Sequence, residues 1–165
     1  MQRCFGFAQH GKIMNKKFLN GFLSDDELHQ IALKIKEKEF LTAGEIVVSV
    51  KEKKPFFHKG KSVFEHAVSE FKKRGIKKTR DHTGILIFIL LKEREFYILA
   101  DSAINDKVAE NTWELVKDKM EASFREKKFC EGIIDAVDEV GNILSKHFPR
   151  KSDDTNELPD EVHIS

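Results

Sequence analysis

The stretch GILIFILLKEREFYILA, residues 84–100, decides the fold of this chain. Its first part, residues 85–91, is uniformly apolar, which predicts a strand with both faces buried rather than one with a face in water. Three charged residues, 92–94, interrupt the pattern before residues 96–99 resume it. Charges between two short apolar runs indicate a turn. The stretch therefore predicts a β-hairpin with a buried first strand.

Another strand and two helices are predicted upstream of the hairpin. Residues 45–52 contain a short β-branched run, which favours a buried strand. Capping boxes, in which a serine is followed three residues later by a glutamate, begin helices at Ser24 and Ser62. The first helix is expected over residues 24–39, and Gly75 provides a left-handed end for the second.

Two more helices are predicted downstream, over about residues 109–126 and 129–147, because apolar side chains recur there at helical spacing. The resulting order is helix, strand, helix, strand, strand, helix, helix. It predicts an α/β fold, a three-layer α/β/α sandwich around a small mixed β-sheet. The first two strands should be parallel, because a helix connects them, and the hairpin makes the third antiparallel.

Charge and cysteine content exclude several classes of protein. The chain has 29 Lys and Arg residues against 28 Asp and Glu residues, so a net charge of +1 predicts no nucleic-acid partner. Cys4 and Cys130 lie far apart, which argues against a disulfide framework. No apolar run has the length of a signal peptide or of a membrane span of about 20 residues. We expect a soluble, cytoplasmic protein without a transmembrane segment.

The ends of the chain differ from its middle. Residues 1–21 are predicted to be a flexible N-terminal extension, and within it residues 1–13 read so differently that Met14 is the expected natural start. Residues 22–149 form the predicted domain. Residues 150–165 are an acidic C-terminal tail without a core pattern, which predicts mobility.

Five polar residues are expected to meet at one edge of the sheet. The segment before Gly84 should lie beside the segment that follows the hairpin, and the parallel strand should begin at the same edge. Carboxylate and amide oxygens are hard ligands that suit Ca²⁺ or Mg²⁺. The predicted metal ligands are Glu45, Asp81, Asp101, Asn105 and Asp106.

A second interpretation of this acidic segment stays open. Asp101, Asn105 and Asp106 are residue types that cap helices, so without a bound ion they would simply mark a strand end followed by a helix start. The segment is not an EF-hand, because Ala103 stands at its third position and Asp106 takes the place of the glycine at its sixth.

Three other kinds of site are excluded because residues that they require are missing. The loop that ends at Ser62 has Pro55 where a phosphate-binding loop needs its first glycine, so nucleotide binding there is rejected. Cys130 is not followed by the arginine that a cysteine phosphatase uses to bind phosphate. No pair of histidines has the spacing of a zinc site.

Several short motifs, taken together with their order and spacing, resemble the TPM domain between about Phe22 and Pro149. They are FLS at 22–24, GEI at 44–46, TR at 79–80, TGIL at 83–86, ADSAIN at 100–105, Trp113, residues 124–132 and the Phe-Pro pair at 148–149. The NELPDE run at 156–161 is similar to the ending of short cytoplasmic members of that family.

The resemblance implies an α/β/α sandwich that binds a divalent cation, calcium in some members, at acidic loops. It also implies a weak acid phosphatase activity, which is described for a thylakoid relative. Carried over by position, it supports Asp81, Asp101 and Asp106 as ligands, followed by Glu45. It further implies a LemA-type membrane protein as a possible partner.

These observations lead to three expectations for function. The first is a monomeric TPM-type domain that binds a divalent cation and has a structural or protein-interaction role. The second is a metal-assisted phosphomonoesterase. The third is an adaptor whose tail, residues 157–165, docks on another protein and folds as it binds.

Overall fold

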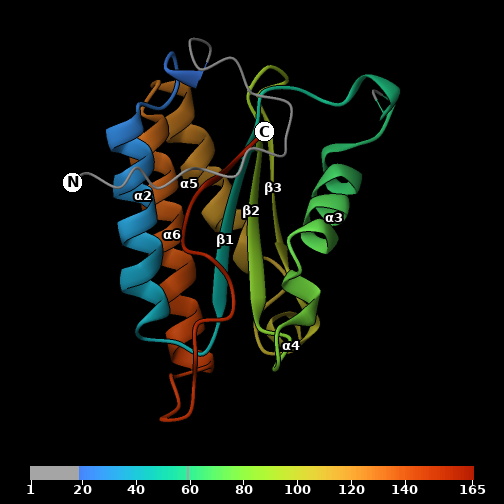
Figure 1. Cartoon of the computed structure of the whole chain (residues 1–165). Helices are drawn as coiled ribbons and strands as arrows, with labels where there is room; N and C mark the ends of the chain where they lie inside the picture. The colour runs from blue at the N-terminus through green and yellow to red at the C-terminus, as the bar shows by residue number, and fades with distance from the viewer. Residues whose placement is uncertain (1–18, 59) are drawn as a thin grey trace, which may run out of the picture.

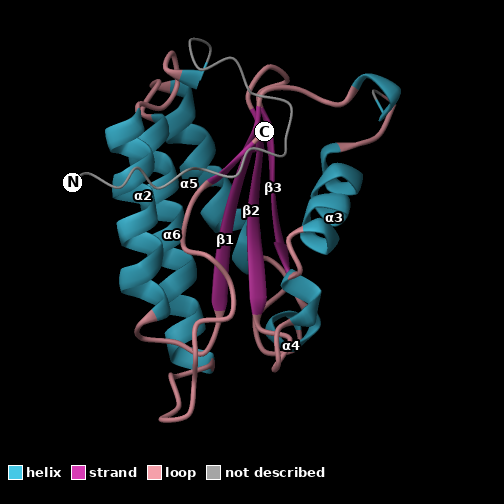
Figure 2. Cartoon of the chain, viewed as in Figure 1, coloured by secondary structure: helices cyan, strands magenta, loops and turns pink. Residues whose placement is uncertain are grey.

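A four-stranded mixed sheet separates three long helices on one face from a single helix on the other (Figure 1, Figure 2). The computed structural model describes residues 19–58 and 60–165, so residues 1–18 of the expected extension over residues 1–21 lie outside the described residues. Leu19, which was assigned to that extension, is buried in the core. The expected three-layer α/β/α sandwich is confirmed.

The elements follow the predicted order with four short additions. The helices are α2 (Asp25–Glu39), α3 (Val63–Lys73), α4 (Ser102–Asn105), α5 (Thr112–Arg125) and α6 (Phe129–His147), the strands are β1 (Glu45–Lys51), β2 (Gly84–Leu90), β3 (Glu95–Ala100) and β4 (His163–Ile164), and one-turn 3-10 helices cover Phe56–His58 and Ile76–Lys78. The sequence pattern did not predict α4, β4 or the two 3-10 helices, because elements of two to four residues are too short to show a periodic pattern.

The expected strand directions are confirmed. The sheet order is β3-β2-β1-β4, with β1 parallel to β2 and β2 antiparallel to β3. The hairpin loop spans 91–94, and Arg94 adopts a left-handed backbone with φ of 57°. The predicted break at residues 92–94 is therefore the turn itself.

Both predicted capping boxes begin helices. The Ser24 hydroxyl accepts a hydrogen bond from the Glu27 N–H at 3.2 Å, and the Glu27 carboxylate accepts one from the Ser24 N–H at 2.7 Å. Ser62 and Glu65 repeat this reciprocal pair at the start of α3. Each box satisfies donors that the first turn of a helix leaves open.

The two central strands bury both faces, which explains the uninterrupted apolar sequence of β2. Alternate side chains of a strand point to opposite faces of the sheet. One set contacts α2, α5 and α6, and the other set packs beneath α3. The first set from β2 is Ile85, Ile87 and Ile89, and the second is Leu86, Phe88 and Leu90.

The C-terminal segment, which was predicted to be a mobile acidic tail without a core pattern, completes the sheet. β4 lies parallel to β1, with Ser49 opposite His163 and Val50 opposite Ile164. The Ser165 N–H donates to the Val50 carbonyl at 3.0 Å, and the Glu52 N–H donates to the Ser165 carbonyl at 3.0 Å. The sequence did not predict β4, because backbone pairing at the edge of a sheet does not need an apolar sequence.

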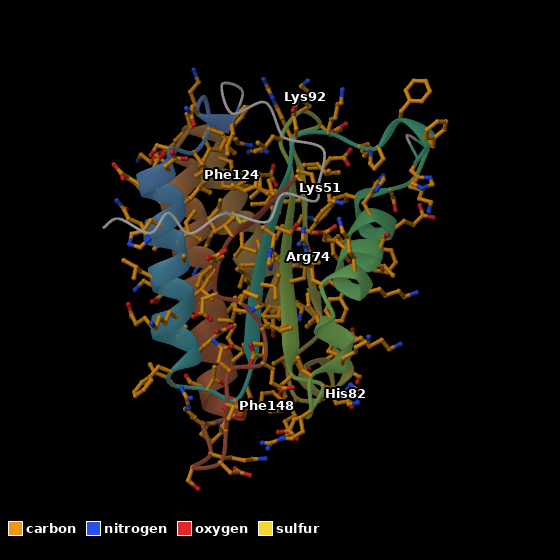
Figure 3. All side chains as sticks on the ribbon, viewed as in Figure 1. Lys51, Arg74, His82, Lys92, Phe124 and Phe148 are labelled. Atoms are coloured by element: carbon orange, nitrogen blue, oxygen red, sulfur yellow. The ribbon has the colours of Figure 1, made fainter. Side chains whose placement is uncertain are left out.

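A buried carboxylate joins α3 to β1. Glu70 is 1% exposed, and its side chain pairs with Lys51 at 2.7 Å and Arg74 at 2.6 Å and accepts a hydrogen bond from the Ser49 hydroxyl at 2.9 Å. Figure 3 labels Lys51 and Arg74, which lie along this layer. Burial by itself raises the pKa of Glu70, but the two cations outweigh it and lower the pKa to about 2.

Glu70→Gln should destabilise the domain by roughly 3 kcal/mol, because it leaves two partly buried cations without their shared anion. The matched control is Glu121→Gln, which breaks an exposed pair with Arg125 at the same helical spacing and should cost at most about 0.5 kcal/mol. Urea unfolding at pH 7 measures both values.

The folded pKa of Glu70 lies below its ordinary value of 4.5, so its contribution is complete above pH 4.5 and falls away as the pH drops toward 2. The difference between wild type and Glu70→Gln should shrink over that window. An equal cost for Glu70→Gln and Glu121→Gln at pH 7 would contradict the proposed role of Glu70.

Candidate functional site

The starts of β1 and β2 and the end of β3 meet at one end of the sheet, as the predicted strand directions imply. Glu45 at the start of β1 lies opposite Gly84 at the start of β2. The Asp101 N–H, directly after β3, donates to the Gly84 carbonyl at 2.9 Å. The two strand starts and the strand end therefore bring polar side chains to the same end of the molecule.

Asp101, Asn105 and Asp106 hold the local backbone in place. The Asp101 carboxylate caps α4 by accepting from the Ser102 N–H at 2.8 Å. The Asn105 amide donates to the Ala100 carbonyl at 2.9 Å and accepts from the Trp113 indole N–H at 3.3 Å. Asp106 is the C-cap residue of α4 and is exposed. These roles match the interpretation that the residues cap a helix after a strand end.

Asp81 and His82 lie beside this turn. The Asp81 carboxylate is 3.6 Å from both the Arg80 guanidinium and the Lys151 ammonium. His82 has a left-handed backbone with φ of 54°, and its Nδ1 atom is 3.4 Å from Asp101 Oδ2. Figure 3 shows His82 at the same end of the molecule as Phe148, which ends α6. Asp81 and Asp101 thus each have a basic neighbour.

Glu45 belongs to a different environment from the other four predicted ligands. Its carboxylate is buried and accepts hydrogen bonds from the N–H groups of Glu157 at 2.8 Å and Leu158 at 3.2 Å. Burial raises the pKa of Glu45, although these two hydrogen bonds act in the opposite direction. The carboxylate of Glu157 accepts in turn from the Arg80 N–H. Glu45 and Glu157 therefore hold the C-terminal segment against the sheet.

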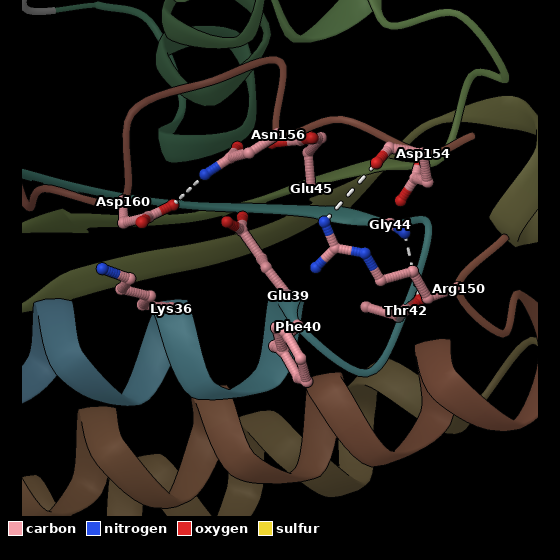
Figure 4. A pocket seen from close by; sticks show the side chains of 10 residues that line it. All are labelled: Lys36, Glu39, Phe40, Thr42, Gly44, Glu45, Arg150, Asp154, Asn156 and Asp160. Atoms are coloured by element: carbon pink, nitrogen blue, oxygen red, sulfur yellow. Dashed lines mark hydrogen bonds between the residues drawn. The ribbon is translucent and has the colours of Figure 1, made fainter. Parts of the chain in front are cut away.

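A cavity of about 220 Å³ opens where the C-terminal segment crosses the ends of α2 and β1 (Figure 4). Four carboxylates line it, together with two basic side chains and several small or polar ones. The lining residues are Lys36, Glu39, Phe40, Thr42, Gly44, Glu45, Arg150, Asp154, Asn156 and Asp160. This acidic cavity, formed by these ten residues, is the candidate functional site.

Glu39 is the buried carboxylate of the acidic cavity. It is 7% exposed, and its Oε1 atom accepts from the Ile46 N–H at 2.6 Å, whereas Oε2 has no hydrogen-bond donor in the part of the chain that the structure describes. In Figure 4 its carboxylate points into the cavity, between Asp160 and Glu45. Burial, reinforced by interaction with Asp160, raises the pKa of Glu39 to about 10. At neutral pH the side chain therefore carries a proton that it can share with Asp160.

The carboxylates of the cavity do not form a ready-made ion cage. Within residues 19–58 and 60–165, no three His, Cys, Asp or Glu side chains are grouped closely enough to hold a metal ion. The donor atoms are nevertheless hard oxygens, and one of them is buried without a hydrogen-bond donor. This chemistry suits a proton or a hard cation.

The family model of the TPM domain matches residues 18–143, which is more than half of the chain. The chain belongs to the TPM domain family. No curated protein matches the chain.

Solved structures share the fold of this TPM domain. The BA42 protein of the psychrophilic bacterium Bizionia argentinensis is 29% identical, with a TM-score of 0.78 over 87% of this chain and 96% of that one. The N-terminal domain of a P. gingivalis protein is 15% identical, with a TM-score of 0.64 over 79% and 83% of the two chains. The N-terminal domain of the cg2496 protein of Corynebacterium glutamicum is 12% identical, with a TM-score of 0.58 over 83% and 82%. The last two similarities show the fold alone.

Of the residues that line the acidic cavity of this TPM domain, only Glu45 was among the predicted ligands. Glu39 left a signal, because it follows Ile31 and Ile35 at the same four-residue spacing and so stands on the buried face of α2. An acid on an apolar stripe indicates a partnered or functional group. Asp154 and Asp160 left no such signal, because only the folded path of the C-terminal segment brings them to the cavity.

Two further observations concern the rest of the TPM domain. Cys130 is free and buried, and burial raises the pKa of its thiol, which agrees with an inert thiol on a helix face. No helix in the described part of the chain combines the length and the apolar character that crossing a membrane requires.

Glu39→Gln should make the TPM domain more stable at pH 8, by roughly 3 kcal/mol. The folded pKa of Glu39 lies above its ordinary value of 4.5, so the stability of the wild type is greatest below pH 4.5 and falls as the pH rises toward 10. Glutamine keeps the acceptor for the Ile46 N–H, provides a donor toward Asp160 and does not titrate. Urea unfolding with a chelator present, from pH 5 to pH 9, measures the effect.

Glu37→Gln serves as the control, because Glu37 is an exposed residue of the same helix. This substitution should leave the pH dependence of the wild type unchanged. A wild-type stability that rises from pH 5 to pH 9, or a Glu39→Gln variant that is less stable than wild type at pH 8, would refute this description of Glu39.

Proposed function

We propose that this TPM-domain protein binds a divalent cation in the acidic cavity and uses it to fix the C-terminal segment, in a structural or protein-interaction role. The observation that carries the proposal is the buried Oε2 atom of Glu39, which accepts no hydrogen bond from the described residues and points toward Asp160 in a cavity also lined by Glu45 and Asp154. A small hard cation such as Ca²⁺ or Mg²⁺ provides the positive charge that these oxygens lack.

Binding would draw the C-terminal segment inward. Glu39 and Glu45 stand on α2 and β1, whereas Asp154 and Asp160 stand on the segment that leads to β4. A cation coordinated from both sides would replace the proton that Glu39 shares with Asp160. Cation binding in the cavity would then stabilise β4. A partner that contacts the C-terminal segment would bind the cation-loaded and cation-free forms with different affinity.

Millimolar Ca²⁺ should raise the melting temperature of the wild type, because an ion at 100 times its dissociation constant adds about 2.7 kcal/mol. Glu39→Gln should remove most of this shift, and Asp101→Asn should keep it. Since the ion displaces the proton of Glu39, its affinity should rise by up to about tenfold per pH unit between pH 6 and pH 9. Thermal melts and calorimetric titrations with Ca²⁺, Mg²⁺ and Mn²⁺ give these values.

Glu121→Gln is the control variant, because it changes an exposed carboxylate on α5 that does not line the cavity. The absence of a shift with all three ions would refute cation binding. A shift that survives Glu39→Gln but is lost in Asp101→Asn would move the ion to the rim of Asp81, Asp101, Asn105 and Asp106.

A second candidate function is metal-assisted hydrolysis of a phosphate monoester at that rim. The observation in its favour is the His82–Asp101 pair, in which a left-handed backbone, costly for a residue other than glycine, holds the imidazole beside the carboxylate. Arg80, which neighbours Asp81, adds positive charge that suits a phosphate. In such a reaction the cation polarises a phosphoryl oxygen, and a rim carboxylate orients the water.

If this second function holds, p-nitrophenyl phosphate should be hydrolysed in the presence of Mg²⁺ or Ca²⁺. Asp101→Asn and Asp81→Asn should each lower kcat by roughly 100-fold or more in a protein that still melts like the wild type. Glu121→Gln should retain full turnover. Weak hydrolysis that both rim variants retain would identify a contaminant and end this candidate.

A further inference from the structure

We propose that the loop between β1 and α3 inserts two phenylalanines into an anionic phospholipid surface. In Figure 1 this loop swings away from the sheet before the chain returns to α3. Its one-turn 3-10 helix, Phe56–His58, carries the two most exposed phenylalanines of the described chain, Phe57 at 91% and Phe56 at 75%. The inference is independent of the cation site proposed above.

Hydrogen bonds and an ion pair hold both ends of the loop, and these contacts fix the position of its tip. At its start, the Lys54 N–H donates to Glu93 at 3.0 Å and the Lys54 ammonium pairs with Glu95 at 2.9 Å. At its end, His66 on α3 forms a hydrogen bond with the His58 carbonyl at 3.1 Å. The two phenylalanine rings contact each other edge to face, with their centroids 5.5 Å apart. The rings are therefore held outward as a pair.

The charge around the rings matches an anionic surface. Residues 53–61 contain four lysines and no Asp or Glu, although the whole chain has a net charge of only +1. Lys53 and Lys61 are exposed, and neither has a carboxylate within ion-pair distance among the described residues. Lysines that surround inserted aromatic side chains are typical of segments that lie in the interface of anionic membranes.

A lipid surface fits this tip better than a protein partner does. A stable protein interface buries about 800 Å² on each partner, and its centre is depleted of lysine. Here two rings project from a loop whose other exposed residues are lysine, proline, histidine, glycine and serine. Long lysine side chains can lie along the lipid while their ammonium groups reach the phosphates.

Insertion of the two phenylalanines and attraction of the lysines to the lipid phosphates are each too weak to hold the protein on a membrane. Together they are sufficient. Burying one phenylalanine strengthens binding by roughly tenfold or more, and each lysine near an anionic surface adds about fivefold. Binding should therefore need phosphatidylserine and should weaken as salt screens the lysines.

The test is co-sedimentation of the full chain with vesicles of phosphatidylcholine, with and without phosphatidylserine, at low and high salt. The wild type should bind only the phosphatidylserine vesicles. Phe56→Ser with Phe57→Ser should lower the affinity roughly 100-fold, and Lys53→Glu with Lys61→Glu should lower it by roughly tenfold or more. All of these positions are exposed, so the melting temperature should not change.

Two matched controls accompany these variants. Leu33→Ser with Leu115→Ser removes two exposed leucines from α2 and α5, and Lys72→Glu with Lys77→Glu makes the same change in net charge at the other end of α3. Both should bind like the wild type. As an independent readout, the emission of Phe57→Trp should shift to the blue on phosphatidylserine vesicles, whereas that of Leu115→Trp should not.

Three results would overturn the proposal. One is wild-type binding that does not depend on phosphatidylserine, and another is equal binding by the double phenylalanine variant. The third is a wild-type dimer, measured by light scattering, that the phenylalanine substitutions dissociate while no vesicle binding occurs. That outcome would assign the loop to a protein interface.

Discussion

The parallel pairing of β1 with β2, buried on both faces, is the constraint on which the rest of the molecule depends. Neither strand can stand beside water, because every side chain of β2 is apolar and so are the β1 side chains that face the three-helix layer, Ile46, Val48 and Val50. Helices must therefore cover both faces, and the chain provides α2, α5 and α6 on one and α3 on the other. The buried Glu70 is tolerated in this layer because two cations and a hydroxyl surround it.

A consequence of this core is that polar chemistry collects at the strand ends. β1 has 7 residues, which corresponds to a length of roughly 23 Å. At one end of it lie Glu45, the acidic cavity and the carboxylates of the α4 turn. At the other end the chain enters the loop of Lys53, Phe56 and Phe57. The two proposed activities, cation binding and membrane docking, thus occupy opposite ends of the same strand.

The C-terminal segment connects features that are otherwise separate. Asp154 and Asp160 line the acidic cavity, and between them in the chain Glu157 donates to Glu45 and accepts from Arg80. The end of the segment pairs with β1 as β4. Glu39 of the helical layer, whose pKa is raised by burial and by Asp160, faces this segment. A change of charge in the cavity therefore acts directly on the part of the chain that closes the sheet.

The sequence alone determined the elements whose stabilising interactions are local. The capping boxes at Ser24 and Ser62, the hairpin break at residues 92–94 and the apolar stripe of α6 depend on neighbours within a few residues, so their patterns predicted the helices, strands and strand directions. The family also followed from the order and spacing of motifs, before the family model confirmed it.

Only the tertiary structure decided where the polar side chains point and what they meet. Glu45, Asp81 and Asp101 share one end of the sheet as predicted, yet Glu45 faces the C-terminal segment while Asp101 caps α4. Strand β4 and the meeting of Glu39 with Asp160 arise between segments more than 100 residues apart. Contacts between segments so far apart depend on how the whole chain folds. The spacing of apolar residues within one short segment predicts only that segment's own secondary structure.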